Sequence, residues 1–137
     1  MIQIQSILKV ADNSGAKTVK CIKILNKSKQ AHIGDYILVS VQTVKSGLQN
    51  TTNFSTKRSS SIKKGQIFKA LIIRTKKPIS NRPHGHTLSF QSNDVVLLSS
   101  GPISNAKLIG SRIFGPVTRE LRLKNYTNII SQAKRIL

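Results

Sequence analysis

Apolar and polar residues alternate along residues 36–45, and this is the clearest pattern in the chain. Ile37, Val39, Val41 and Thr43 share one face, and more polar side chains occupy the other face. A period of two residues is typical of a β-strand that buries one of its faces. We therefore predict a half-buried strand here.

Three other segments also predict strands. Residues 7–10 form a short apolar run that ends at Asp12–Gly15, a turn-forming sequence. Residues 18–25 alternate and are rich in β-branched side chains, which favours a strand. Residues 66–75 contain Ala70–Ile73, which is apolar on both faces, so we expect this strand to be central in its sheet.

The last third of the chain predicts a hairpin and two short helices. Residues 87–90 and 95–98 flank the turn-forming Ser92–Asp94, and together they predict a β-hairpin. Pro116 directly follows a glycine and predicts the first turn of one helix, and Asn125 predicts the N-cap of a second. Short strands with long basic loops, and helices only at the end, favour a mainly β fold, a small β-barrel.

Residues 46–61 interrupt the pattern of strands. Gly, Asn, Thr and Ser dominate this stretch, and apolar residues nearly vanish from it. Such a segment has too little apolar surface to fold alone. We predict an exposed polar insert within a single domain that spans residues 1–137 and ends in a helical corner over residues 110–137.

The net charge of the chain indicates which class of partner the protein binds. The 137 residues include 23 Lys and Arg against 4 Asp and Glu, a formal net charge of +19, and the basic residues are spread along the chain. Nucleic acid is the expected partner, because phosphates bind such proteins through counterion release. Aromatic residues are only 4%, so contacts to the phosphates, riboses and shape of folded RNA fit better than base stacking along a single strand. No apolar run approaches the roughly 20 residues that span a bilayer, so we expect no membrane contact.

The acidic residues do not suggest catalysis. Asp12, Asp35 and Asp94 each lie in a turn, where a carboxylate ordinarily accepts backbone N–H bonds. Glu120 lies four residues before Lys124, which is ion-pair spacing on a helix. A two-metal nuclease needs carboxylates that converge on one pocket. We therefore predict that the protein is not an enzyme.

Metal and cofactor motifs are also missing from the sequence. His84 and His86 lie far from Cys21 and do not supply the paired four-ligand spacing of a zinc site. Cys21, the single cysteine, falls within a predicted strand, so we expect a buried thiol. No glycine-rich loop of the Walker or dinucleotide type occurs. We expect neither a metal nor a cofactor.

The stretch at residues 110–122 combines three signals. Its glycines permit unusual backbone conformations, and Val117 and Leu121 would share one face of a helix. Phe114 is assigned to an apolar anchor. The arginines Arg112, Arg119 and Arg122 have planar forks that suit phosphate. Ordinary surface arginines on a solvated helix are the alternative interpretation.

This stretch also begins a family resemblance. Further matches are Val10–Ala16, Lys63–Gly65 with Ala70–Lys77, and the spacing of Gly85, Phe90, Asn93 and Val96–Leu97. Together these segments resemble a universal large-subunit ribosomal protein, the L-fourteen family. The chain departs from the family pattern at residues 46–61, where the family is shorter, and at His84, where the family often has a small polar residue such as Asp.

The resemblance implies a compact five-stranded β-barrel with C-terminal helical turns. It also implies binding to large-subunit ribosomal RNA on the face that meets the small subunit. The implied partners include neighbouring large-subunit ribosomal proteins, small-subunit rRNA at an intersubunit bridge, and a ribosome-silencing factor. A DNA-compacting protein or an accessory to an RNA-acting enzyme remains the alternative function.

Candidate phosphate ligands are the cations that lie close to turns or within the matched segments. They are Lys17, Lys63, Lys64, Arg74, Lys76, Lys77, Arg82, Arg112, Arg119 and Arg122. Lysines in the middle of predicted strands, such as Lys20 and Lys23, are not included, because they could simply be solvent-exposed residues at the edge of the barrel.

Localisation follows from composition and from departures within the family. Richness in Ile, Lys, Asn and Ser, the polar insert, and the Lys134–Arg135 ending suggest an organellar genome. The N-terminal residues resemble neither a signal peptide nor a transit helix. We expect a mitochondrial ribosome, with a plastid or a bacterial cytoplasm as the alternative.

Overall fold

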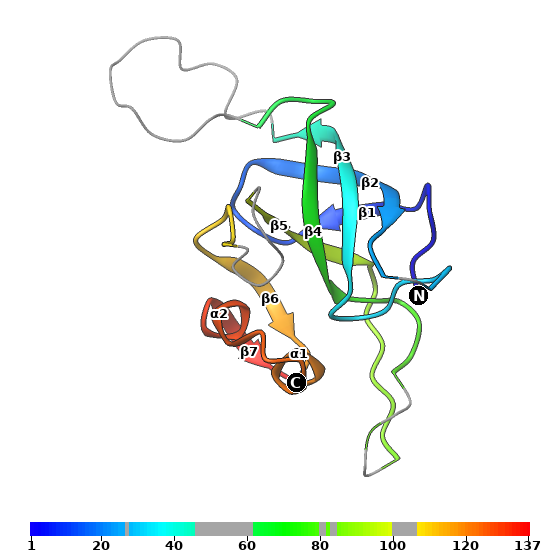
Figure 1. The fold of residues 1–137 in the computed structure, drawn as a ribbon. Helices are drawn as coiled ribbons and strands as arrows, with labels where there is room; N and C mark the ends of the chain where they lie inside the picture. The colour runs from blue at the N-terminus through cyan, green and yellow to red at the C-terminus, as the bar shows by residue number, and fades with distance from the viewer. Residues whose placement is uncertain (27, 46–61, 80–81, 83–84, 100–106) are drawn as a thin grey trace.

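Five strands close into a barrel (Figure 1). The computed structural model describes residues 1–26, 28–45, 62–79, 82, 85–99 and 107–137. The strand order is β1-β2-β3-β4-β5, and sequential neighbours are antiparallel, whereas β1 and β5 close the barrel in parallel. The strands are β1 (Ile7–Val10), β2 (Ala16–Ile24), β3 (Tyr36–Val44), β4 (Ile67–Arg74) and β5 (Asp94–Leu98). The predicted five-stranded barrel and mainly β class are confirmed.

The barrel core follows the predicted patterns. On β3 the side chains of Ile37, Val39 and Val41 are buried, and the residues between them are only partly covered. The second half of β4 and all of β5 are buried without alternation, as expected for strands covered on both faces. The predicted half-buried strand is confirmed as far as Val41, whereas Thr43, predicted on the same face, is exposed. The predicted central strand is also confirmed, since β4 has β3 on one side and β5 on the other.

A β-bulge in β2 changes which residues face the core. Cys21 pairs with Val39 while Lys23 pairs with Leu38, so one extra residue is inserted in β2. Cys21 is buried, as predicted, but the alternation then resets, and Ile22 is 40% exposed. Burial raises the pKa of the Cys21 thiol.

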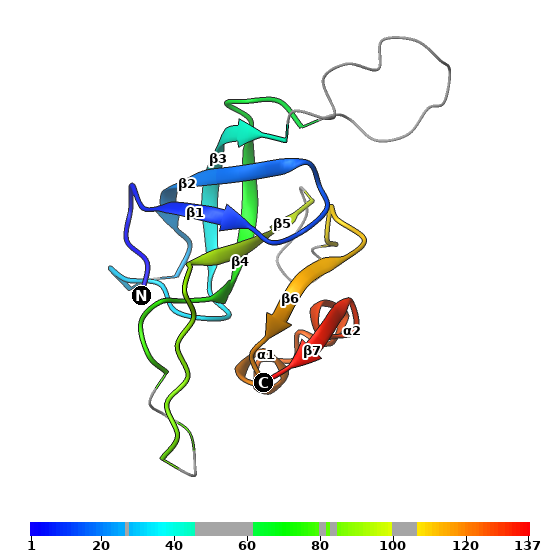
Figure 2. The ribbon, with the colours of Figure 1, turned by 180° about the vertical axis from the view of Figure 1, so that it is seen from behind.

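The C-terminal segment lies beside the barrel and contains a strand pair that the sequence did not reveal (Figures 1 and 2). Strands β6 and β7 are parallel to each other and form a separate two-stranded sheet. Two short helices lie between them, which confirms the helices predicted for this end of the chain. The elements are β6 (Ile113–Val117), α1 (Glu120–Leu123), α2 (Thr127–Ser131) and β7 (Ala133–Ile136).

Pro116 therefore lies in a strand, and its prediction as the first helical residue was wrong. Because the β6–β7 sheet is two-stranded, each strand is an edge strand, where a residue without an N–H group is tolerated. The helix begins at Glu120, so Val117 and Leu121 do not share a helix face, although both are fully buried.

Two further local predictions were wrong. The segment 87–90 does not form a hairpin with β5: Leu88 bridges to Ile79, and β5 pairs with β4 and β1. The N-cap of α2 is Tyr126, whereas Asn125 has a φ of 62° and lies in the turn between the helices. Asparagine is one of the few side chains that tolerate this left-handed conformation.

Side chains fasten the helices to the barrel. The Tyr126 hydroxyl donates to the Gly34 carbonyl at 3.0 Å, and its ring meets Tyr36 edge-on with centroids 5.6 Å apart. Lys124 Nζ donates to the carbonyl of Ile33 at 3.0 Å. The predicted insert at residues 46–61 and His84 lie outside the described residues. None of the described helices is long and apolar enough to cross a membrane.

Candidate nucleic-acid interface

The acidic side chains are all engaged inside the protein. Asp12 is fully buried and accepts hydrogen bonds from the N–H groups of Ser14 at 2.9 Å and Leu97 at 2.8 Å. Asp35 accepts one from the N–H of His32 at 2.8 Å. The predicted turn role of these two aspartates is confirmed. The structural reason is that each carboxylate accepts hydrogen bonds from backbone N–H groups that would otherwise lack a partner.

Asp94 has a different partner, which is Arg74. The register of β4 against β5 places the two residues opposite each other, and Arg74 Nε lies 2.6 Å from Asp94 Oδ2. Both side chains are buried. Arg74 Nη1 also donates to the carbonyls of Phe114 at 2.9 Å and Pro116 at 2.7 Å. Arg74 thus ties the barrel to β6, and these internal contacts leave little of its guanidinium for the predicted phosphate contact.

The same contact explains a glycine of the 110–122 stretch. Gly115 has a φ of 80°, and a Cβ added there would lie 2.8 Å from Arg74 Nη1. A side chain would therefore be strained by the backbone and would also collide with the guanidinium. Gly115 is needed so that the chain can pass close over Arg74.

Glu120 pairs with Arg82, and its predicted helical pairing with Lys124 was wrong. Arg82 contacts both carboxylate oxygens of Glu120, at 2.8 and 3.1 Å, and both side chains are 22% exposed. Lys124 lies beyond the end of the short helix α1 and pairs instead with Asp35 at 3.0 Å. Burial raises the pKa of Glu120, but the hydrogen bonds and charge of Arg82 outweigh it, so this pKa lies below its usual value.

The other predicted phosphate ligands are exposed on the surface. They are Lys17, Lys63, Lys64, Lys76, Lys77, Arg112, Arg119 and Arg122. They do not gather at one place, because Lys63 and Lys64 precede β4 whereas Lys76 and Lys77 follow it. A strand of that length separates them by about 26 Å. The exposed cations therefore lie at both ends of β4 and on the C-terminal segment.

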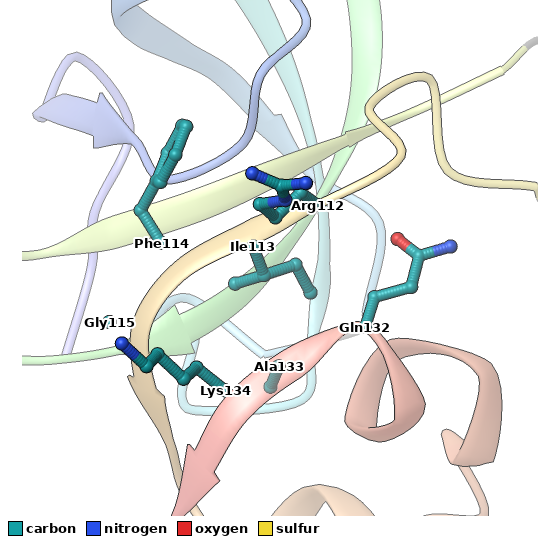
Figure 3. Close-up of a pocket in the computed structure, with 7 residues that line it drawn as sticks. All are labelled: Arg112, Ile113, Phe114, Gly115, Gln132, Ala133 and Lys134. Atoms are coloured by element: carbon teal, nitrogen blue, oxygen red, sulfur yellow. The ribbon is translucent and has the colours of Figure 1, made fainter.

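A groove of about 520 Å³ lies over the start of the paired strands β6 and β7 (Figure 3). We call it the β6–β7 groove. It is lined by Arg112, Ile113, Phe114, Gly115, Gln132, Ala133 and Lys134. Arg112 and Lys134 are exposed and add positive charge to its wall.

Phe114 is part of this groove and is not the apolar anchor that the sequence predicted. Its side chain is 46% exposed, whereas Ile113 and Val117 are 2% and 0% exposed and provide the anchor. Lys45 Nζ lies 5.1 Å from the centroid of the Phe114 ring, within the range of a cation–π contact. Sequence analysis missed Lys45, because only the tertiary fold brings it to β6.

The described residues hold no group of three or more His, Cys, Asp and Glu side chains that could bind a metal ion. The groove walls are cationic and apolar, and the carboxylates of the chain bind other parts of the protein. This arrangement suits the binding of an anion rather than acid–base chemistry.

A comparison with protein-family models matches the whole chain. The model described as Ribosomal protein L14p/L23e covers residues 1–137. The match confirms the resemblance that the four sequence segments indicated.

Proposed function

The chain belongs to the L14p/L23e family of ribosomal proteins, and from this premise we propose that it binds large-subunit ribosomal RNA near the interface with the small subunit. As a member of that family it is a structural component of the ribosome and not an enzyme. Within the proposal, its role is to fold a region of rRNA and to hold it in place during translation.

The distribution of charge carries the proposal. The carboxylates of Asp12, Asp35, Asp94 and Glu120 are used inside the protein, by backbone N–H groups or by internal ion pairs. The net charge of +19 is therefore carried by lysines and arginines, most of which are exposed among the residues that the structure describes. A protein of this kind binds a polyanion with strong salt dependence.

The positions of the cations favour folded RNA as that polyanion. Lys63 and Lys64 lie at one end of β4, and Lys76 and Lys77 lie at the other, while Arg119 and Arg122 lie on the C-terminal segment. A single straight duplex cannot contact all of these points on a small barrel. Folded rRNA can surround the protein and reach them through phosphates and 2′-hydroxyls.

Neighbouring large-subunit proteins, small-subunit rRNA at an intersubunit bridge, and a silencing factor complete the proposed set of partners. Leu123 is 81% exposed and Ile136 is 45% exposed on the C-terminal segment. Exposed apolar side chains of this kind are suited to protein contacts.

We place this ribosome in the mitochondrion. The richness in Ile, Lys, Asn and Ser and the insert at residues 46–61 support an organellar genome. Fractionation of the source cells tests this placement, since the protein should sediment with mitochondrial large subunits. Recovery with plastid or bacterial large subunits would contradict it.

RNA binding is tested by titrating the protein with a large-subunit rRNA transcript and with duplex DNA of equal charge, over a range of salt concentrations. We expect tighter binding to the rRNA at every salt concentration. The double variants K63Q/K64Q and K76Q/K77Q should each lower the slope of log K against log salt, by about 0.9 for every phosphate that the variant no longer neutralises. Equal affinity for duplex DNA would favour the DNA-compacting alternative and would overturn the proposal.

A further inference from the structure

Phe114 is an exposed aromatic residue in a strand whose other apolar side chains are buried. The chain has few aromatic residues, 4% of the total, and one of them leaves 46% of its surface exposed in a short, otherwise anchored strand. Its neighbours Ile113 and Val117 are buried, so the fold does not need this ring in the core. A large exposed ring beside a groove is typical of a surface that binds a flat partner.

The surroundings of the ring indicate an anionic partner. Lys45 Nζ lies 5.1 Å from the ring centroid, and Arg112 and Lys134 line the same groove. Figure 3 shows the Phe114 ring and the Arg112 side chain on one side of β6, while the Lys134 side chain extends from β7 toward Gly115 of β6. None of the described residues that line the groove carries a carboxylate.

The groove also fits a nucleotide in size and in polar groups. Its volume of about 520 Å³ lies in the range of about 300–1,000 Å³ typical of small-ligand sites. Gln132 lines the wall, and its buried Oε1 has no hydrogen-bond partner among the described residues. A carboxamide carries both a hydrogen-bond acceptor and donors, which match the polar edge of a base.

We propose that the β6–β7 groove binds one unpaired nucleotide of the large-subunit rRNA, with its base stacked on Phe114 and its phosphate held by Arg112 and Lys134. This inference rests on the proposed function and adds to it a site that binds one unstacked base. Bases inside an A-form duplex are stacked on each other and cannot reach a protein ring, so the nucleotide must come from a loop, bulge or end.

Binding of the large-subunit rRNA transcript by Phe114 variants tests the site. F114L keeps an apolar side chain but removes the aromatic face, and F114W keeps the face. We expect F114L to weaken binding about 5- to 100-fold with an unchanged salt slope, because stacking is not a charge interaction. F114W should bind like the wild type. I7A, which shortens an apolar side chain of β1 that is 68% exposed and outside the groove, is the matched control and should leave affinity unchanged.

Ultraviolet cross-linking of the wild-type complex supplies a second measurement. A stacked base should cross-link to the peptide that contains Phe114, and the attached nucleotide should map to an unpaired position of the transcript. Wild-type affinity in F114L, or a cross-link confined to small-subunit rRNA or to a protein, would overturn the inference. If K63Q/K64Q still weakens rRNA binding in that case, the proposed function stands without this site. If the wild-type protein does not prefer rRNA to duplex DNA, the proposed function itself fails.

Discussion

Replacing Arg74 by leucine should strongly destabilise the folded protein without acting on the RNA directly. The side chain is buried, pairs with Asp94 at 2.6 Å, and also donates to the carbonyls of Phe114 and Pro116. In R74L, the Asp94 carboxylate would remain buried but would lose its cationic partner. Among the described side chains, the Ser92 hydroxyl, 3.0 Å away, would still donate a hydrogen bond to it.

The magnitude follows from that uncompensated charge. Breaking a buried ion pair by removing one partner costs about 3–5 kcal/mol of unfolding free energy. Small domains have roughly 5–15 kcal/mol in total, so R74L should lose a large fraction of its stability. For a domain of this length we expect the melting temperature to fall by roughly 10–20 °C.

Thermal melts of the free protein by circular dichroism measure this effect. R122L removes an exposed arginine and is the matched control, with an expected change of about 0.5 kcal/mol or less. The double variant R74L/D94L removes both charges and should recover most of the lost stability. If R74L melted like the wild type but bound rRNA with a lower salt slope, Arg74 would be a phosphate ligand, and our description of its role would be refuted.

Three further predictions concern the surface. Arg82 lowers the pKa of Glu120, so the ion pair contributes stability that is full above the unfolded-state pKa. The melting difference between wild type and E120Q should therefore be present at pH 7 and be lost in acid, as the pH falls through the lowered folded-state pKa. A difference that grows with acidity would show that Arg82 does not stabilise the carboxylate. Replacing residues 46–61 by a tight turn should leave the melting temperature unchanged, because the Gly65 N–H donates to the Val41 carbonyl at 2.9 Å and already holds the strand ends together. A large fall in the melting temperature would instead show that the insert is part of the core. R119A should hardly change the melt but lower the salt slope of rRNA binding by about one. Unfolding of the free variant with normal ribosome incorporation of its folded fraction would make Arg119 a structural residue instead.

The sequence predicted the barrel because each strand has a local pattern. The alternation of Ile37, Val39 and Val41 reports the inner face of β3 directly, and the apolar run in β4 reports coverage on both faces. These patterns depend on residues that are close together in the chain. Their interpretation therefore does not need the tertiary structure.

The role of Arg74 could not be predicted for the opposite reason. Its partner Asp94 lies on the next strand, and only the register of β4 with β5 brings the two together. In the sequence, Arg74 is an arginine near the end of a strand, just like a surface cation. Charge alone therefore predicted phosphate binding, whereas burial assigns the side chain to the interior.

Phe114 was misplaced because a local rule was applied to an irregular strand. A large apolar residue between an isoleucine and a glycine ordinarily indicates an anchor, and Gly115–Pro116 ordinarily indicates a helix start. The pairing of β6 with β7 overrides both rules, and it links residues that are about twenty positions apart, such as Ile113 and Ala133. The groove could be found only after this pair of strands was known.

The parallel closure of the barrel has a consequence for how the chain folds. Lys9 pairs with Asp94, and Val10 with Val95, so the barrel cannot close during synthesis until most of the chain has been made. Contacts this distant in sequence form slowly. During the delay, β1 has an unpaired edge of the kind that adheres to other chains. Mutual repulsion between chains that each carry a net charge of +19 opposes such pairing, so the same cations that we assign to RNA would also protect the unfinished protein from aggregation.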